Sequence, residues 1–280
     1  MLKIAVSEQA AIGLEDFVAR FEAARFDTSD PASLIEAAAL LSALARDREF
    51  LTALVIRELE TDLVYQRESN GYSPEVIMLS KSEDFLIRAN LWPSATDEIY
   101  RQNRPESFFY NVPHDHNFNL LTVGYLAPGY ESDDYDYDHE CVAGYPQEPV
   151  RLRFRGRSRL EEGDVALYRA GRDVHSQLPP EAPSVSLNVV DASPHVFFRE
   201  QYLFDDELGS LRCIIGLRCN PALFTLAAML GGEEAQDRLL RIHRDHDSGF
   251  VAMQALKARP NRWRRKSGAP VAKPSPIPRA

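Results

Sequence analysis

Three of the seven histidines are spaced as the ligands of one metal ion would be. His114 and His116 lie in VPHDHNFNLL, at the start of a predicted strand. Residues two apart in a strand point to the same face of a sheet, so both imidazoles can reach one ion. His175 ends the segment GDVALYRAGRDVH, just after another predicted strand, and a barrel would bring that strand end alongside the first. Three neutral imidazoles leave coordination positions open for a substrate and dioxygen. A turn histidine that caps a strand is the structural alternative for His175.

Three further residues lie where they could serve such a site. Arg88, in FLIRANLW, could bind a substrate carboxylate through two hydrogen bonds, or it could point outward from the sheet. Tyr168 and Arg169 fall on opposite faces of their strand, so at most one of them faces the interior. Tyr168 could donate a hydrogen bond to dioxygen or substrate, or it could belong to the core. Asp115 points away from the two histidines that flank it, and we expect it to hold a loop.

The elements that must position these residues are short strands between about residue 75 and residue 195. The runs VIML, FLIRANLW, NLLTVGYL, GDVALYRAG and PSVSLNVV are apolar or alternating, and Gly, Pro and Asp turns separate them. VRLRF alternates strictly between apolar residues and arginine. Many short strands of this kind predict an all-β sandwich or barrel.

Helical patterns precede and follow the strands. In residues 1–74, Leu14, Phe17, Val18 and Phe21 recur at helical spacing. A second helix is expected to begin at Ser29 or Asp30 as its N-cap, with Pro31 in the first position, and a third to span about residues 47–63.

The C-terminal third of the chain is predicted to be helical as well. Residues 196–263 contain three short amphipathic pieces whose rhythm is like that of HEAT repeats. Residues 264–280 are basic and rich in proline, and we expect them to be a disordered tail. Apolar helical stripes need a partner surface, so both helical segments are expected to dock on the barrel or on a second copy of it. A separate helical domain is the alternative, and a homodimer stays open.

Composition restricts the class of partner. The formal net charge is −10, which argues against nucleic acid, because phosphate binding needs clustered Lys and Arg. No run of apolar residues is long enough for a membrane helix. The three cysteines are scattered and odd in number, as in a reduced cytoplasmic protein. In the acidic run ESDDYDYDHE, alternation predicts that Asp134, Asp136 and Asp138 line the wet face of a strand, rather than a calcium site.

Four segments together are similar to the cupin superfamily: FLIRANLWPSATD, VPHDHNFNLLTVGYL, GDVALYRAGRDVH and PSVSLNVVD. Within it, residues 80–191 most resemble the three-histidine thiol dioxygenase branch, meaning cysteine dioxygenase and its relatives. The usual cupin glutamate after the second histidine is absent, because Leu120 and Leu121 stand there. The resemblance implies a β-barrel that binds Fe(II), or another first-row divalent metal, through His114, His116 and His175.

The sequence also departs from cysteine dioxygenase. Its Ser-His-Tyr relay corresponds to Ser186, Asn188 and Val190, so only the serine is kept. By the resemblance, Ser186 and Asn188 face inward, and we take them with Tyr168 as candidate catalytic residues. Asn188 cannot titrate near neutral pH, so it would orient a ligand rather than move protons. These departures argue against free cysteine as the substrate.

The sequence therefore predicts an all-β cupin barrel with helical segments at both ends, α+β overall. The function it favours is a mononuclear non-haem iron oxygenase that acts on a small molecule and dioxygen. Two alternatives stay open, because a fold does not fix a function. One is a metal-binding cupin that senses a small ligand or serves as an interaction module, and the other is a metal-dependent isomerase or epimerase.

Overall fold

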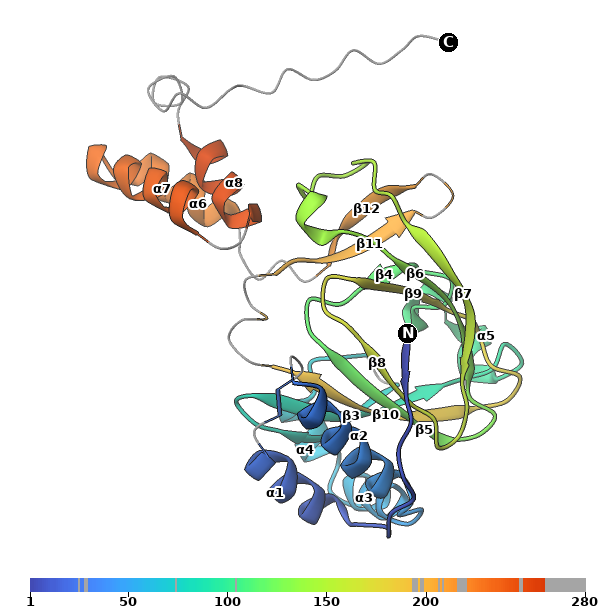
Figure 1. The fold of residues 1–280 in the computed structure, drawn as a ribbon. Coiled ribbons are helices and arrows are strands. Elements are labelled where there is room, and N and C mark those ends of the chain that lie inside the picture. Colours follow the sequence, from blue (N-terminus) through green and yellow to red (C-terminus); the bar gives the residue numbers. More distant parts are fainter. Residues whose placement is uncertain are drawn as a thin grey trace. The chain divides into compact units, whose positions relative to one another are not determined.

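Two six-stranded antiparallel sheets form the centre of the computed structural model (Figure 1). Sheet A has the order β1-β8-β5-β10-β3-β2, and sheet B has the order β12-β11-β4-β9-β6-β7. The strands of sheet A are β1 (Leu2–Ile4), β2 (Val76–Lys81), β3 (Phe85–Trp92), β5 (Leu120–Leu126), β8 (Val165–Tyr168) and β10 (Ser184–Asp191). Those of sheet B are β4 (His114–Asp115), β6 (Tyr130–Asp136), β7 (Arg153–Leu160), β9 (Asp173–Gln177), β11 (Gln201–Asp205) and β12 (Ser210–Ile215).

The structure describes residues 1–259 except 25, 28–29, 74, 104, 193–195, 197–198, 206, 208, 216–220 and 247–248. Ser29, one of the two predicted N-caps, Cys219 and the predicted tail 264–280 lie outside the described residues. The chain divides into two compact units, Met1–Ile215 and Gly216–Ala280. Both sheets belong to the first unit.

The eight strands from β3 to β10 have the connectivity of a jelly roll. Four of them form the run β8-β5-β10-β3 in sheet A, and the other four form the run β4-β9-β6-β7 in sheet B. If the strands β3 to β10 are renumbered 1 to 8 along the chain, the two runs read 6-3-8-1 and 2-7-4-5. This is the double-sheet arrangement that cupins use. The predicted cupin-type barrel with helical segments before and after it is confirmed.

Sheet A is buried on both of its faces. One face carries Ile87, Leu121, Val123 and Leu187, which belong to the largest apolar cluster. Strand residues alternate between faces, so Arg88, Thr122 and Asn188, the neighbours of these residues, point the other way, into the barrel. The outward face is therefore apolar, whereas the inward face carries polar residues beside apolar ones such as Leu120 and Val190.

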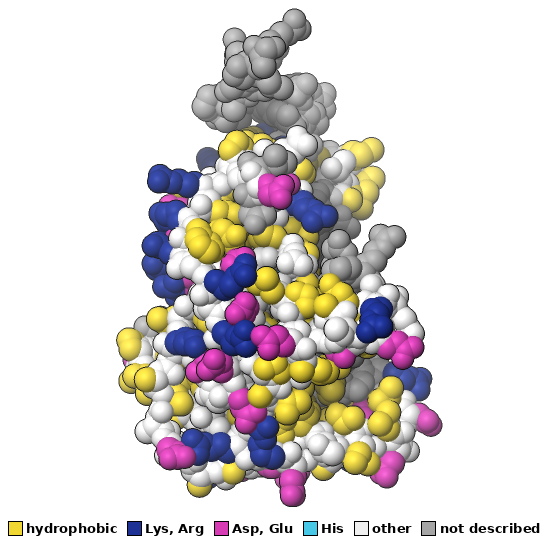
Figure 2. Space-filling view, turned by 90° about the vertical axis from the view of Figure 1, so that its right-hand side faces the viewer, with side chains coloured by type: hydrophobic (Ala, Val, Ile, Leu, Met, Phe, Trp, Pro, Cys, Tyr) yellow, Lys and Arg dark blue, Asp and Glu magenta, His cyan; other side chains and the backbone are white. Residues whose placement is uncertain are grey.

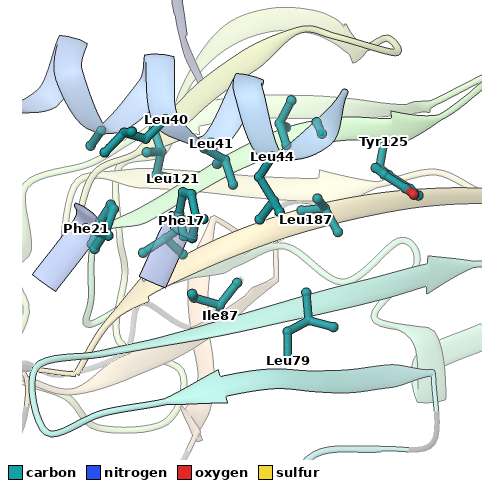
Figure 3. Packing of buried hydrophobic residues seen from close by; sticks show 14 of the residues in the cluster. Phe17, Phe21, Leu40, Leu41, Leu44, Leu79, Ile87, Leu121, Tyr125 and Leu187 are labelled. Atoms are coloured by element: carbon teal, nitrogen blue, oxygen red, sulfur yellow. The ribbon is translucent and has the colours of Figure 1, made fainter. Parts of the chain in front are cut away.

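Helices of the N-terminal segment cover the outward face. They are α1 (Leu14–Ala24), α2 (Pro31–Ala45), α3 (Phe50–Glu60) and α4 (Val64–Ser69). Asp30 caps α2 by accepting a hydrogen bond from Ala32 N, and Pro31 follows it, as predicted. Figure 3 shows Phe17 and Phe21 of α1 and Leu41 and Leu44 of α2 beside strand residues of sheet A. The docking predicted for the N-terminal helices is confirmed.

Two parts of the segments predicted to be helical are strands. β11 and β12 form a hairpin in the predicted helical stretch 196–263, and β11 pairs with β4. In QYLFD, buried and half-buried residues alternate, and Tyr202 and Phe204 are the buried ones. This period of two suits a strand that pairs with the edge of a sheet, and it does not suit a helix. Near the N-terminus, β1 pairs with β8. In both places, pairing with a strand distant in sequence overrides the helical pattern of the neighbouring residues.

The second unit contains the three helices predicted for the C-terminal segment. They are α6 (Pro221–Leu230), α7 (Glu233–Asp245) and α8 (Gly249–Ala258). Their likeness to HEAT repeats and their docking on the barrel stay predictions. Three short helices complete the elements of the first unit: α5 (Glu98–Gln102), η1 (Pro105–Phe108) and η2 (His139–Cys141). Among the described residues, no helix combines the length and the apolar character that a membrane crossing requires.

Two substitutions in α2 test whether the helices and the barrel form one cooperative unit. Leu41 is 0% exposed in the cluster shared with sheet A, whereas Ile35 is 56% exposed. Leu41→Ala should lower the free energy of unfolding by about 2–5 kcal/mol, because it leaves a cavity. Ile35→Ala should change it by no more than about 0.5 kcal/mol. Urea unfolding of the metal-free protein, followed by circular dichroism, measures both. Equal effects of the two substitutions would contradict the docked arrangement.

Candidate metal centre

The three predicted histidines meet inside the barrel. His114 lies directly opposite His175 in the β4–β9 ladder, and His116 follows two residues after His114. One ring nitrogen from each residue can be chosen so that all three lie within 4.8 Å of one another. The side chains are 4%, 5% and 1% exposed for His114, His116 and His175. The face drawn in Figure 2 shows acidic and basic side chains interspersed, and no histidine is visible on it.

The environment keeps these imidazoles neutral. Burial lowers the pKa of His114 to about 4; the hydrogen bond to Val112 opposes this shift, and the nearby charge of Arg88 adds to it within that value. Burial likewise holds the pKa of His116 and the pKa of His175 well below the ordinary value. A neutral imidazole keeps a lone pair on one nitrogen, which is the form that binds metals.

The hydrogen bonds of the histidines leave nitrogens free to face one another. His114 Nδ1 donates to the Val112 carbonyl over 2.8 Å, so its Nε2 carries the lone pair. The Nε2 atoms of His116 and His175 are 3.0 Å apart. One ion with metal–nitrogen bonds of about 2.0–2.1 Å could contact both. The donor set and its spacing therefore fit a divalent first-row ion.

Two glutamines that the sequence analysis did not single out lie beside the histidines. Gln177 Nε2 is 3.1 Å from His175 Nδ1. Gln201 Nε2 donates to the Asp115 carbonyl over 2.8 Å and lies 3.3 Å from His116 Nδ1. Gln177 could have been found, because it follows His175 by two residues in one strand. Gln201 could not, since its strand lay in a predicted helical segment.

Asp115 points away from the histidines, as predicted, and ties β4 to its surroundings. Its Oδ2 accepts a hydrogen bond of 2.5 Å from the Tyr137 hydroxyl, and its Oδ1 accepts one of 2.6 Å from Tyr202 N in β11. Burial raises the pKa of Asp115 to about 7, although both hydrogen bonds act in the opposite direction. A buried carboxyl group thus anchors the short strand that carries His114 and precedes His116.

Tyr168, one of the predicted catalytic residues, lies beside His175. Its ring centroid is 4.1 Å from that of His175. Its hydroxyl is buried, and besides burial, hydrogen bonds with the side chains of Ser132 and Tyr130 contribute to its pKa. Burial raises the pKa of Tyr168 well above its ordinary value, so the phenol keeps its proton. Arg169 faces the other side and pairs with Asp173, over 2.6 Å.

Arg88 also lies inside the barrel. Its side chain is 7% exposed, and its guanidinium carbon lies 4.4 Å from the centre of the Tyr72 ring. Its Nε has no hydrogen-bond partner in the part of the chain that the structure describes. Burial lowers the pKa of Arg88. Its charge contributes to lowering the pKa of both His114 and His116.

Ser186 and Asn188 face inward but already have polar neighbours. Ser186 Oγ accepts a hydrogen bond of 2.9 Å from Trp92 Nε1. Asn188 Nδ2 donates to Asn90 Oδ1 over 3.2 Å and to Ser186 Oγ over 3.4 Å. These contacts orient the two side chains on sheet A. Catalytic roles for Ser186, Asn188 and Tyr168 stay predictions.

The acidic strand β6 is a correction to the sequence analysis. Asp134 and Asp136 were predicted on a solvent-exposed face. Each is only 4% exposed, and both lie on the buried face of β6. Asp136 is paired with Arg153 and Arg155. Asp134 accepts a hydrogen bond of 2.6 Å from Ser158, and its Oδ2 lies 3.4 Å from the Met1 amino group. These partners, distant in sequence, offset the cost of burying the carboxylates.

Comparisons with known proteins give distant structural likenesses only. No family model and no curated protein matches the sequence. The chain is similar to hydroquinone 1,2-dioxygenase from Sphingomonas sp. TTNP3, with 13% identity, a TM-score of 0.31, and coverage of 46% of this chain and 74% of that one. Salicylate 1,2-dioxygenase from Pseudaminobacter salicylatoxidans gives 10% identity, a TM-score of 0.28, and coverage of 50% and 33%.

A conserved protein with a double-stranded β-helix domain from Klebsiella pneumoniae gives 15% identity, a TM-score of 0.26, and coverage of 49% of this chain and 89% of that one. Likenesses of this extent carry no information on substrate or reaction. The assignment to the cysteine dioxygenase branch therefore stays a prediction.

The pKa of Asp115 predicts how stability depends on pH. Its folded-state pKa of about 7 exceeds the ordinary 3.8, so its contribution is full at about pH 4 and is lost as the pH rises through 7. Asp115→Asn removes this titration. The stability of the metal-free wild type relative to this variant should therefore fall by about 2–4 kcal/mol from pH 4 to pH 7. Urea unfolding at several pH values measures the difference, and a difference independent of pH would contradict the prediction.

Proposed function

We propose that this protein is a mononuclear non-haem iron oxygenase that acts on a small molecule with dioxygen. Fe(II), or another first-row divalent ion, would be held by His114, His116 and His175. The observation that supports this most is the set of three buried, neutral imidazoles whose donor atoms lie within 4.8 Å of one another. Such a set has few structural uses, because a buried polar ring needs a partner for each nitrogen.

The bound ion would supply the redox chemistry between substrate and dioxygen, and three protein ligands leave positions open for them. The residues of the chain would bind and orient the substrate. Arg88 would contact an anionic group of the substrate, since its buried Nε has no partner within the described chain. Tyr168, beside His175, would donate a hydrogen bond from a phenol that keeps its proton at neutral pH.

Ser186 and Asn188 would complete the sheet A side of the site. Their mutual hydrogen bond and their contacts with Trp92 and Asn90 fix the orientation of both side chains. Neither residue titrates near neutral pH, so in this proposal they position the substrate and do not transfer protons. Burial of the whole set excludes bulk water, which strengthens each polar contact.

Metal content tests the first half of the proposal. The purified protein should hold about one first-row divalent ion per chain. His116→Ala and His175→Ala should each lower metal content strongly, because a site with two ligands binds much more weakly. Elemental analysis after dialysis measures this, with His243→Ala, a substitution in the second unit, as the matched control. Full occupancy in both barrel variants would refute the assignment.

Oxygen consumption tests the second half. Iron-loaded protein should consume dioxygen with a small-molecule substrate found by screening, whereas a ligand sensor would bind such molecules without consuming oxygen. Free cysteine should give little or no sulfinate, because Asn188 and Val190 replace the histidine and tyrosine of the cysteine dioxygenase relay. Robust sulfinate formation at millimolar cysteine would show that these departures do not matter.

A further inference from the structure

Two glutamine side chains lie beside the Nδ1 atoms of two candidate metal ligands. Gln201 Nε2 lies 3.3 Å from His116 Nδ1. Gln177 Nε2 lies 3.1 Å from His175 Nδ1 and 3.3 Å from His175 Nε2. A neutral imidazole has one nitrogen that donates and one that accepts, and the partners of the ring decide which is which. The two amides therefore influence whether each ring presents a lone pair or a hydrogen to a metal ion.

The backbone of β4 fixes the orientation of the Gln201 amide. Gln201 Nε2 lies 2.8 Å from the carbonyl oxygen of Asp115, which can only accept a hydrogen bond. The amide nitrogen, and not the amide oxygen, must therefore face this carbonyl. Because the NH2 group carries two hydrogens, the second one is available to His116 Nδ1. Gln201 thus places a donor beside His116 Nδ1, and this nitrogen must accept.

This donor sets the direction of a chain of hydrogen bonds. Since His116 Nδ1 accepts, the hydrogen of the neutral ring is on Nε2, and it is donated to His175 Nε2 over 3.0 Å. His175 Nε2 therefore holds the lone pair of its ring, and His175 Nδ1 carries the hydrogen. That hydrogen needs an acceptor, and Gln177 is the neighbour of His175 Nδ1.

The Gln177 amide, unlike that of Gln201, can supply an acceptor. Its Oε1 is buried and has no hydrogen-bond partner among the described residues. The two ends of an amide have the same shape, so half a turn of the group exchanges Oε1 and Nε2 beside His175 Nδ1. Oε1 then accepts the hydrogen of His175 Nδ1. The chain of hydrogen bonds runs from the Asp115 carbonyl to Gln177 without two donors or two acceptors facing each other.

The three candidate ligands are consequently not equivalent. His114 donates from Nδ1 to the Val112 carbonyl over 2.8 Å, so its Nε2 holds a lone pair, as does that of His175. His116 instead has its hydrogen on Nε2. For this Nε2 to bind an ion, its hydrogen must leave and another must bind Nδ1, so that the ring stays neutral. Gln201 opposes this exchange, because two donors would then face each other.

We propose that Gln177 and Gln201 are positioning residues with opposite effects on metal affinity. Gln177 favours the tautomer of His175 that binds a metal through Nε2, whereas Gln201 favours the tautomer of His116 that does not. Gln201 must turn away from His116 Nδ1 before all three rings can bind one ion through Nε2. The proposal rests on the proposed function for the identity of the ligands. It adds that one side chain of β11 limits the affinity of the site.

Substitution by methionine, which keeps the length of glutamine and removes its amide, separates the two effects. Gln177→Met should lower the affinity for Co(II) about tenfold, and Gln201→Met should raise it about tenfold. Competition with a chelating dye measures both affinities on the full chain. Gln102→Met, at an exposed position of α5, is the control. Removing a glutamine that merely supports the fold would not raise the affinity, so an unchanged or lower affinity of folded Gln201→Met protein would overturn the proposal.

Imidazole tautomers give a second readout that does not depend on a metal. Hydrogen–nitrogen correlation spectra of the full chain, labelled in its histidine rings and dialysed against a chelator, distinguish rings with a hydrogen on Nδ1 from rings with one on Nε2. We expect the hydrogen on Nε2 in His116 and on Nδ1 in His114 and His175. Gln201→Met should move the hydrogen of His116 to Nδ1.

A wild-type His116 with its hydrogen on Nδ1 would contradict the proposal, even where Gln201→Met protein does not fold. A wild-type chain that binds no Co(II) would instead refute the proposed function. In that case the spectra still decide whether Gln201 sets the tautomer of His116, so the two failures are distinguishable.

Discussion

Burial of sheet A on both faces is the constraint on which the rest of the structure depends. Its outward residues, such as Ile87, Leu121 and Leu187, pack against α1 and α2 and supply apolar contacts. Because these contacts stabilise the sheet from outside, the inward face can carry polar residues beside its apolar residues Leu120 and Val190. Arg88, Thr122 and Asn188 can therefore occupy the inward face. The N-terminal helices are thus part of what allows the barrel to place polar residues in its interior.

The position of the histidines depends on parts of the chain outside the eight-strand barrel. β4 is only two residues long, so its own ladder contributes little to its placement. Asp115 compensates by accepting hydrogen bonds from Tyr137 and from the backbone of β11. Gln201 adds a hydrogen bond to the Asp115 carbonyl. The hairpin β11–β12 consequently holds the strand that carries His114 and leads directly into His116.

Electrostatics of the interior favour ligand binding over internal pairing. The histidines are neutral, so they do not repel a cation, and each keeps a lone pair for one. Arg88 keeps its charge without a carboxylate partner in the described chain, in contrast to Asp136, which is paired twice. Folded proteins leave such groups unpaired mainly where function requires it. The same interior therefore offers separate features for a metal ion and for an anion.

Local patterns in the sequence determined the barrel, the helices of residues 14–60 and the three histidines of the candidate metal centre. Period-two alternation and the spacing of His114 and His116 act between near neighbours, and so they can be read without tertiary contacts. Only the tertiary structure decided which face of a strand is inside. Asp134 and Asp136 lie on the buried face because Ser158, Arg153 and Arg155 from the next strand pair with them. QYLFD became a strand because β4 offered it an edge, and Arg88 points inward because helices cover the other face. Each of these outcomes depends on partners far away in the sequence, which no local pattern specifies.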